Sequence, residues 1–333
     1  MSTTDAAPPL STPLVVGVDL GGTKMAAALV TADGALAGPL ASVPTPARSG
    51  PEAVLDAIAS VVDTVVSAGT HQAHGAPVAV SAVGVGSAGV VNVSTGTIVS
   101  ATDAITGWTG TLVATGVRSR LIAQGYGDMP VHVENDVDAY AGGEAWLGAG
   151  RDASSVLVVA VGTGVGGSVV INGTTVRGAH YVAGEIGHVP APGAENEMCT
   201  CGRRGHLEAI AAGPQIHRRY LAAGGDPEVA NAFEVEQRAD AGDPIASLVY
   251  RDSAIALGKV LAGVVAVLDP ERVVLSGGLA RAGELWWAPL RETFRAELID
   301  PLADVPLVRA ELGTNAPIIG AARGALSLLG ATA

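Results

Sequence analysis

The feature that most constrains the fold is a glycine-rich turn that occurs twice, each time between two apolar stretches. The first copy is "VVGVDLGGTKMAAALV" (residues 15–30), and the second is "LVVAVGTGVGGSVVI" (residues 157–171), which runs into an "NG" pair. Stretches rich in Val and Ile favour strands, and Asn-Gly favours a two-residue hairpin. The pattern therefore predicts two similar α/β halves, each with a glycine turn between antiparallel strands.

The second copy also contains a misleading motif. Gly162, Gly164 and Gly167 match G-x-G-x-x-G, the dinucleotide-binding fingerprint. That fold needs a helix directly after the glycines, because the helix N-terminus holds the pyrophosphate. A β-branched stretch and a hairpin turn follow instead, and no suitable acidic residue lies about twenty residues further on. The sequence thus disfavours a nicotinamide or flavin enzyme and predicts turns whose N–H groups approach phosphate oxygens.

The rest of the chain alternates between helix and strand patterns. A helix is expected from Pro51 to Gly69, and a strand in residues 76–89. Residues 128–140 read as a strand running into a helix, and the glycines of "SGGLA" (residues 276–280) are expected to start another helix. An Ala-rich helix is expected over residues 316–330.

Composition limits the class of protein. The chain has 333 residues, of which 48% are apolar and 15% charged, so a large core can form. The net charge of −13 argues against a nucleic-acid partner, because phosphate backbones require basic patches. No secretory signal and no run of membrane-spanning length is apparent in the sequence. We expect a cytoplasmic protein with no membrane partner.

Two aspartates carry candidate chemistry. Asp19 ends the first strand before the glycines, where a carboxylate would hold Mg²⁺ beside nucleotide phosphates; the alternative is that it only caps a turn. Asp136 lies where a strand gives way to a helix, and a helix N-terminus stabilises the ionised carboxylate. Such a group would accept a hydroxyl proton during phosphoryl transfer; the alternative is an ordinary N-cap residue.

Both cysteines of the chain fall in one short segment, "CTCGRRGH" (residues 199–206). Cys199, Cys201 and His206, with His188 upstream, supply four ligands of the kind that tetrahedral Zn²⁺ requires. A disulfide between the two cysteines would close a very small, strained ring. We expect a structural zinc with no open coordination position; the alternative is a metal-free loop with two reduced cysteines.

The ordered set of motifs resembles the ROK family of sugar kinases and sugar-responsive repressors. The motifs are "GVDLGGTK", "VENDVDAYAGGE", "VAVGTGVGGSVVINGTTVRG", "AGEIGH" and "CTCGRRGHLEAIAAGP", and "VVLSGGLA" and "APIIGAARGA" extend the match to the last helix. The resemblance implies the two-domain actin-like ATPase (ribonuclease H-like) α/β fold, with duplicated βββαβα-type halves around an interdomain cleft. We expect one domain in residues 12–128 plus 317–331, and a larger one in residues 129–316 with the zinc motif.

The resemblance also implies an activity. It is that of an ATP-dependent hexose kinase, which transfers the γ-phosphoryl group to the 6-hydroxyl of a glucose-type sugar, N-acetylglucosamine or glucose. Asp136 would be the catalytic base. The other implied sugar-binding residues are Gly89, Asn135, Glu185, His188 and Glu208. The implied ATP- and Mg²⁺-binding residues are Asp19, Gly21, Gly22, Thr23, Lys24, Gly162, Thr163, Gly164, Gly277 and Gly278.

Further details follow from the same resemblance. Zinc on one ring nitrogen of His188 would leave the other N–H to donate to a sugar hydroxyl. Gly277 and Gly278 would let adenine lie close to the backbone, or else form an ordinary βα turn. Trp108 is expected to pack beneath the sugar loop, "VGVGSAGVVNVSTG" (residues 83–96), and Glu144 is expected to be structural. A homodimer is also implied.

The chain departs from the family pattern in its metal motif and in its sugar loop. His206 stands where the family usually has a third cysteine. Ser87 and Ala88 stand where a proline usually precedes the loop glycine, and Asn92 stands where an aspartate is common. The main alternative to a kinase is a sugar-responsive repressor of the same family, which carries a helix-turn-helix before the first phosphate motif. Only eighteen residues precede Asp19, so we expect a kinase. An actin-like chaperone would leave the zinc cluster unexplained.

Overall fold

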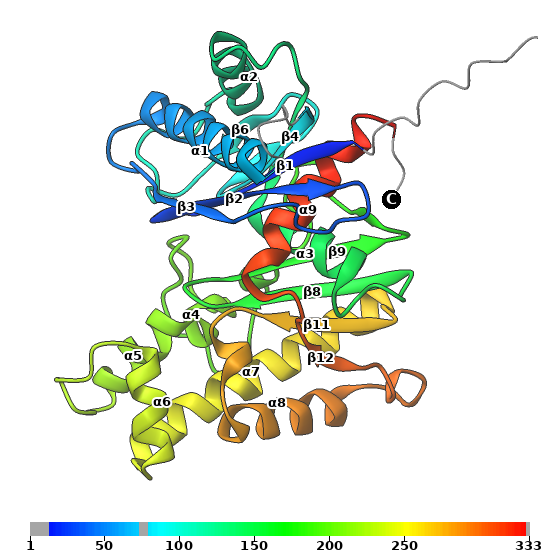
Figure 1. The fold of residues 1–333 in the computed structure, drawn as a ribbon. Helices are drawn as coiled ribbons and strands as arrows, with labels where there is room; N and C mark the ends of the chain where they lie inside the picture. The colour runs from blue at the N-terminus through cyan, green and yellow to red at the C-terminus, as the bar shows by residue number, and fades with distance from the viewer. Residues whose placement is uncertain (1–12, 73–78, 331–333) are drawn as a thin grey trace, which may run out of the picture. The chain divides into compact units, whose positions relative to one another are not determined.

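The computed structural model of the chain describes residues 13–72 and 79–330 (Figure 1). It divides into two compact units, each built on a five-stranded sheet. The first unit runs to Tyr140 and includes the segment from Pro317, and the second comprises Ala141–Ala316. Residues 12 and 331, which bound the expected first domain, lie outside the described residues.

The first unit contains the first predicted glycine hairpin. Its sheet has the order β3-β2-β1-β4-β7. The strands are β1 (Leu14–Leu20), β2 (Lys24–Thr31), β3 (Ala41–Pro44), β4 (Val80–Ser87) and β7 (Val131–Asn135), and a small hairpin of β5 (Val90–Asn92) and β6 (Thr97–Ser100) follows β4. Strands β1 and β2 are antiparallel, as predicted, and β4 and β7 run parallel to β1. The expected boundary at residue 128 would place β7 in the second domain, but β7 pairs with β4 in the first.

Helices cover both faces of this sheet. Helices α1 (Pro51–Gln72) and α2 (Val113–Ala123) pack on one face and share its apolar core (Figure 1). Helix α1 does not end at Gly69 as predicted, because one glycine in a helix costs only about 1 kcal/mol. Helix α9 (Ala316–Ser327) crosses the other face against Gly17 and Gly84. A Cβ atom at Gly84 would lie 1.8 Å from the carbonyl oxygen of Ala321, so this close approach requires glycine.

The second unit repeats the hairpin. Its sheet has the order β10-β9-β8-β11-β12. The strands are β8 (Ser155–Val161), β9 (Val165–Ile171), β10 (Thr174–Thr175), β11 (Arg272–Ser276) and β12 (Leu307–Arg309). Asn172 and Gly173 both have positive φ, 48° and 71°, as the "NG" hairpin turn requires. Strand β9 directly follows the glycines, which confirms that they do not open a dinucleotide-binding helix.

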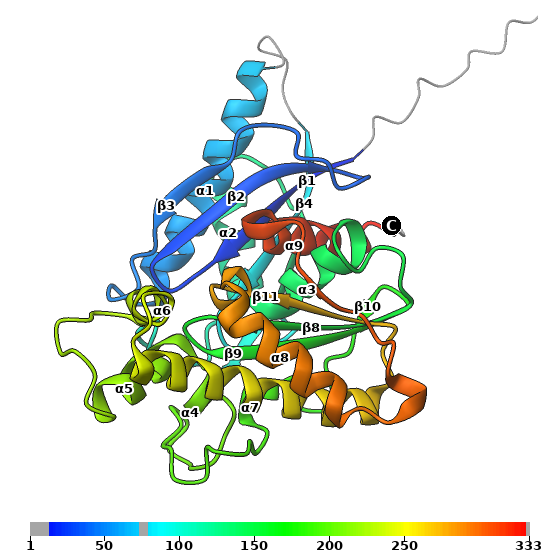
Figure 2. The same cartoon turned by 90° about the horizontal axis from the view of Figure 1, so that it is seen from below.

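Helices α7 and α8 supply much of the core of the second unit and pack side by side (Figure 2). The helices of this unit are α3 (Asp136–Leu147, which begins in the first unit), α4 (Glu208–Ala211), α5 (Gly213–Ala222), α6 (Ala232–Asp240), α7 (Pro244–Leu268) and α8 (Glu284–Glu297). Short 3-10 turns are η1 (Ile186–His188), η2 (Leu279–Arg281), η3 (Asp300–Leu302) and η4 (Gly313–Asn315). The glycines of "SGGLA" therefore open only the turn η2, and the next helix begins at Glu284.

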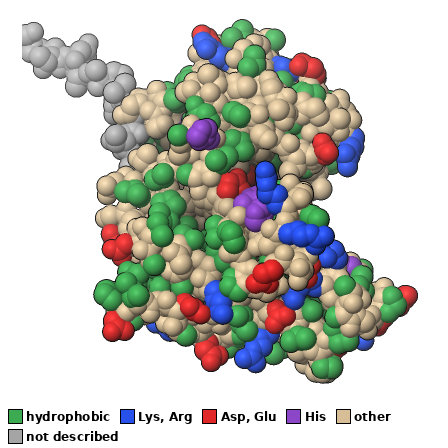
Figure 3. Space-filling model, turned by 180° about the vertical axis from the view of Figure 1, so that it is seen from behind, with side chains coloured by type: hydrophobic (Ala, Val, Ile, Leu, Met, Phe, Trp, Pro, Cys, Tyr) green, Lys and Arg blue, Asp and Glu red, His purple; other side chains and the backbone are tan. Residues whose placement is uncertain are grey.

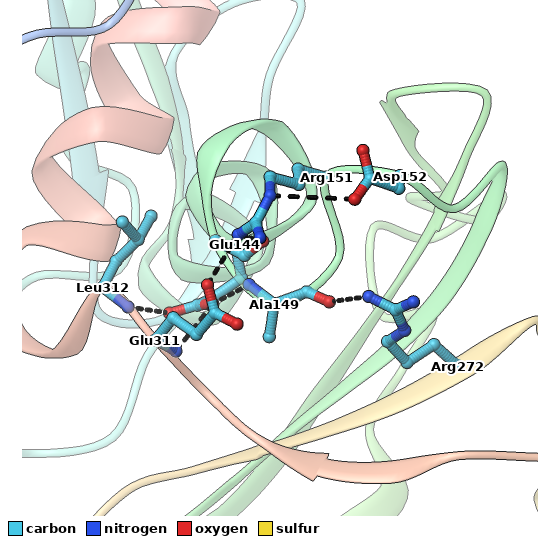
Figure 4. Close-up of polar contacts among 8 residues, drawn as sticks. Glu144, Ala149, Arg151, Asp152, Arg272, Glu311 and Leu312 are labelled. Carbon is cyan, nitrogen blue, oxygen red and sulfur yellow. Dashed lines mark hydrogen bonds and ion pairs between the residues drawn. The ribbon is translucent and has the colours of Figure 1, made fainter.

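Glu144 on α3 was expected to be structural, and its side chain is fully buried among backbone partners (Figure 4). Its carboxylate accepts hydrogen bonds from three backbone N–H groups: Ala149 at 2.9 Å, Glu311 at 3.1 Å and Leu312 at 2.8 Å. The side chain of Glu311 in turn pairs with Arg151 at 2.6 Å. Glu144 thus ties the end of α3 to the segment that leads into α9.

The surface carries charges of both signs. On the face in Figure 3, acidic and basic side chains lie interspersed among apolar ones. Among residues 13–72 and 79–330, no helix is long and apolar enough to cross a membrane.

Candidate active site

In the first unit, the predicted catalytic base and the predicted magnesium ligand lie at one edge of the sheet. Strands β1, β4 and β7 are parallel, so their carboxyl ends lie at the same edge, where ligands bind in open α/β sheets. Asp19 lies near the end of β1, and Asp136 directly follows β7. Gly86 in β4 lies between them, and a Cβ atom there would be 3.7 Å from the Cα of Asp136.

The two aspartates titrate well above their ordinary range. Burial raises the pKa of Asp19 from 3.8 to about 6, although the charge of Lys24 opposes this shift. Burial also raises the pKa of Asp136 from 3.8 to about 6. The N–H of Val137 lowers the pKa of Asp136, and the negative charge of Asp19 raises it. A carboxylate with a pKa near neutrality is suited to exchange a proton with a substrate.

The first glycine turn is held by a residue that the sequence analysis missed. The N–H of Gly21 donates to the carbonyl of Lys24 at 3.1 Å, which closes the turn. The hydroxyl of Thr45 donates to the carbonyl of Gly21 at 2.7 Å, and its N–H donates to Thr23 at 3.0 Å. Thr23 and Lys24 themselves are exposed. Thr45 lies beyond β3, so no local pattern in the sequence indicated its role.

Asn135 is engaged by the protein itself. Its side-chain oxygen caps α3 by accepting from the N–H groups of Val137 at 2.8 Å and Asp138 at 3.2 Å. Its amide nitrogen donates to the carbonyl of Gly89 at 2.9 Å. The resemblance implies that Asn135 binds sugar hydroxyls; here it positions Asp136 and Gly89. Asparagine is a preferred N-cap residue, so its place before the helix already carried this signal.

The predicted sugar loop has a glycine that its backbone requires and a buried tryptophan bonded to it. Gly89 has φ of +99°, and a Cβ atom there would lie 2.8 Å from the carbonyl oxygen of Ser100, so glycine is required. Trp108 is buried, and its indole N–H donates to the hydroxyl of Ser87 at 3.2 Å. This contact agrees with the expected packing of Trp108. The side-chain oxygen of Asn92 accepts from the N–H of Ser94 at 3.1 Å, so Asn92 caps the turn between β5 and β6.

In the second unit, the carboxyl ends of β8 and β11 bring the other predicted glycines together. These strands are parallel, and a Cβ atom at Gly162 would lie 3.7 Å from the nitrogen of Gly278. The N–H of Gly162 donates to the carbonyl of Gly164 at 2.9 Å, which closes the turn around Thr163. Gly277 has φ of +87°, and a Cβ atom there would lie 2.3 Å from the carbonyl oxygen of Val161. Only glycine fits at that position.

A cavity of about 900 Å³ opens beside these glycines. Its lining residues are Gly162, Thr163, Gly213, Pro214, His217, Ala230, Asn231, Ala232, Phe233, Glu236, Tyr250, Gly278, Leu279 and Arg281. The cavity thus contains three of the predicted nucleotide-binding residues. Phe233 is 65% exposed, which is unusual for an aromatic side chain and leaves an apolar surface for a ligand. The contribution of α5 and α6 was not predictable from the sequence, because they lie far along the chain from Gly162 and Gly164.

Two side chains outside the cavity fix the wall formed by η2. The indole N–H of Trp287 donates to the carbonyl of Ala280 at 3.0 Å. The guanidinium of Arg309 donates to the carbonyl of Ala282 at 3.1 Å and stacks over the Trp287 ring, 4.8 Å from its centroid. These contacts hold the backbone that follows Gly277 and Gly278.

The four predicted metal ligands converge. One ligand atom from each of His188, Cys199, Cys201 and His206 lies within 4.8 Å of the others. The Sγ of Cys201 is 3.2 Å from Nδ1 of His206, and both cysteines are free. Zinc bonds of about 2.0 to 2.3 Å would place tetrahedral ligand atoms about 3.3 to 3.8 Å apart. The set therefore fits zinc after a small contraction.

Glu185 and Glu208 differ in their surroundings. Glu185 is exposed, and its carboxylate lies 3.4 Å from Nδ1 of His188, the ring that was expected to face sugar. Glu208 is buried, and its two oxygens accept from the hydroxyl of Thr200 and, at 3.1 Å, from the N–H of Val165. A sugar hydroxyl would have to share or replace these partners.

Comparison with known proteins agrees with the motifs. The ROK family profile matches residues 15–327. The glucokinase of Streptomyces coelicolor is 34% identical over 328 residues, which cover 93% of this chain and 96% of that protein. The ROK hexokinase from Thermus thermophilus superposes with a TM-score of 0.83 at 34% identity, covering 96% of this chain and 100% of that one.

A second solved structure is a ROK family glucokinase from Streptomyces griseus in complex with glucose and AMPPNP. It has a TM-score of 0.74 at 31% identity and covers 94% of this chain and 99% of that one. These likenesses confirm the expected α/β architecture, that of the actin-like ATPases. Together with the ordered motifs and the two glycine hairpins, they show that the chain belongs to the ROK family.

Proposed function

We propose that this protein transfers the γ-phosphoryl group of ATP to the 6-hydroxyl of glucose or N-acetylglucosamine, with Asp136 as the base. A sugar kinase is the activity that the relatives support, since the S. coelicolor protein is a glucokinase and the T. thermophilus protein a hexokinase. ATP as the donor is supported by the S. griseus glucokinase, which was solved with glucose and AMPPNP.

The observation that carries the proposal is the environment of Asp136. It lies at the N-terminus of α3, at the same sheet edge as Asp19, with a pKa raised to about 6. At pH 7.5 the group is mostly ionised, yet it binds a proton more tightly than an exposed aspartate does. An alcohol loses its proton late in phosphoryl transfer, so a base of this kind orients the hydroxyl and then accepts the proton.

The chain's other residues would complete the reaction. The N–H groups of the turns at residues 21–23 and 162–164 would bind phosphate oxygens, and Asp19 would hold Mg²⁺. Magnesium supplies charge that stabilises the transferring phosphoryl group. The cavity beside Gly278 would accept the nucleoside part of ATP, with the Phe233 ring against the adenine. Asn135 would keep Asp136 and Gly89 in place through its three hydrogen bonds.

The cysteine and histidine cluster would have a supporting role. His188, Cys199, Cys201 and His206 would hold one zinc ion, which would keep His188 and its neighbour Glu185 in a fixed position. Glu185, His188 and Glu208 would then present hydrogen-bonding groups to the hydroxyls near C1 and C2 of the sugar. Four protein ligands leave no coordination position for catalysis, so the zinc is structural.

The proposal is tested by measuring ADP release in a coupled assay over a panel of sugars. The panel contains glucose, N-acetylglucosamine, mannose, N-acetylmannosamine and fructose, each with Mg²⁺ and ATP. We expect glucose or N-acetylglucosamine to give the highest kcat/KM, and 6-deoxyglucose to give no turnover. Turnover of 6-deoxyglucose would refute transfer to the 6-hydroxyl, and no activity with any sugar would refute the kinase assignment.

A further inference from the structure

The carboxylate of Glu208 joins two candidate sites of the second unit. One oxygen accepts from the hydroxyl of Thr200, which lies between the two cysteines. The other oxygen accepts from the N–H of Val165 at 3.1 Å, and Val165 directly follows the turn Gly162–Gly164. The thiol of Cys199 also donates to the first oxygen, at 3.8 Å, and because Glu208 is only 9% exposed, its carboxylate depends on these three partners for hydrogen bonding. The cysteine loop (residues 199–206) is thereby connected to the phosphate turn.

Val165 is also held from its other side. A Cβ atom at Gly187 would lie 2.1 Å from the carbonyl oxygen of Val165, so η1 packs directly on the backbone of β9. Gly187 is the residue before His188, the fourth member of the metal cluster. A second glycine pair, Gly167 and Gly184, makes a similar close contact further along β9. Val165, the first residue after the phosphate turn, is therefore contacted from two sides. Glu208 connects it to the cysteine loop, and Gly187 connects it to the segment that carries His188.

Thr200 lies between two members of the metal cluster, Cys199 and Cys201. Thr200 is exposed, and its loop is closed by backbone hydrogen bonds from Cys199 to Arg203 at 2.8 Å and from Gly202 to Cys199 at 3.0 Å. A metal bound to both cysteines would fix the residue between them on each side. Without metal, that residue would be restrained by the loop's backbone hydrogen bonds and by its own bond to Glu208.

We propose that Thr200 is a positioning residue through which metal bound at this cluster orders the phosphate turn, so that metal and nucleotide bind cooperatively. The inference rests on the proposed function, which assigns the turn Gly162–Gly164 to the phosphates of ATP. Metal holds Thr200, Thr200 orients the Glu208 carboxylate, and that carboxylate fixes the N–H of Val165. Thermodynamic linkage then requires nucleotide to tighten metal binding by the same factor by which metal tightens nucleotide binding.

The experiment measures AMPPNP binding by calorimetry in zinc-loaded and chelator-treated protein, for wild type, Thr200→Val and Thr200→Ser. Valine has the shape of threonine without the hydroxyl, and serine keeps the hydroxyl. Loss of one hydrogen bond to a charged group weakens binding about tenfold. We expect zinc removal to raise the Kd for AMPPNP about tenfold in wild type and in Thr200→Ser. Thr200→Val should bind AMPPNP about tenfold more weakly even with zinc, and its Kd should change little on zinc removal.

A second measurement covers the case in which zinc removal unfolds the protein. The rate at which loaded protein releases zinc to a chromophoric chelator is recorded with and without AMPPNP. AMPPNP should slow release in wild type and Thr200→Ser but not in Thr200→Val. An equal effect of AMPPNP in all three proteins, or an AMPPNP affinity that zinc does not change, would overturn the inference. Failure of zinc-loaded wild type to bind AMPPNP at all would instead overturn the proposed function.

Discussion

Replacing Asp136 by asparagine should lower kcat and at the same time stabilise the folded protein. Asparagine keeps the shape of the side chain and the oxygen that accepts from the N–H of Val137, but it cannot take up a proton. Loss of a general base lowers kcat by about 10²- to 10⁴-fold. We expect this loss with little change in the Kd for nucleotide. Asp138→Asn, in the same turn of α3, is the control and should keep kcat within about tenfold of wild type.

The same substitution should stabilise the folded protein. The pKa of Asp136 is about 6 when folded and near 3.8 when unfolded, so the folded state binds the proton more tightly. Stability therefore falls as pH rises from about 4 to about 6, and above that range the buried charge costs up to about 3 kcal/mol. Asparagine carries no charge and avoids this cost. Partial exposure of the side chain reduces the expected gain at pH 8 to about 1 to 3 kcal/mol.

Thermal unfolding at pH 4 and pH 8 measures the effect. The Tm of Asp136→Asn should exceed that of wild type at pH 8, and the two should nearly coincide at pH 4, where folded Asp136 is protonated and unfolded Asp136 is close to half protonated. The kcat/KM of wild type should fall about tenfold per pH unit below about pH 6. A stabilisation of equal size at both pH values, or a variant that keeps more than a tenth of wild-type kcat, would refute the reasoning.

Three further predictions concern the second unit. Gly277→Ala should lower the free energy of unfolding by about 2 to 4 kcal/mol, because φ is +87° and the new methyl group would meet a carbonyl oxygen. Urea denaturation measures this loss, and Gly283→Ala, where a Cβ atom has open space, is the control. Arg309→Gln should raise the KM for ATP several-fold while the KM for sugar and kcat stay within about twofold, which initial-rate kinetics would contradict if all three changed together. Elemental analysis should find about one zinc per chain in wild type and much less in Cys201→Ser, and equal zinc in both would exclude Cys201 as a ligand.

Local patterns in the sequence predicted much of the fold. Both glycine hairpins were predictable because Val-rich stretches and an "NG" turn specify strands at short range, and β9 after Gly164 excluded the dinucleotide fold. The end of α1 was not predictable from Gly69, because tertiary packing of a long apolar face outweighs one glycine. The turn η2 replaced the helix expected after Gly278, because the backbone becomes extended at Ala282 and Gly283 before α8 begins.

The candidate site was less predictable than the fold. Single residues such as Asp136 could be placed because a strand meets a helix there, and the metal cluster because four ligand types lie close in the chain. Thr45, Trp287 and Arg309 reach the site through long-range contacts that no spacing encodes. One hydrogen-bond partner of the Asn135 side chain, the carbonyl of Gly89, also lies far from it in the sequence.

The tryptophans give the molecule two built-in optical reporters. The chain has four tryptophans, and two of them are hydrogen-bonded to segments that border the proposed ligand sites of different units. Trp108 is bonded to Ser87 at the sheet edge of the first unit, whereas Trp287 is bonded to η2 and stacked under Arg309 in the second. Indole emission depends on hydrogen bonding and on nearby charge, so sugar should alter the emission of Trp108 and nucleotide that of Trp287. Fluorescence of single Trp→Phe variants can therefore follow the two ligands separately in the unlabelled protein.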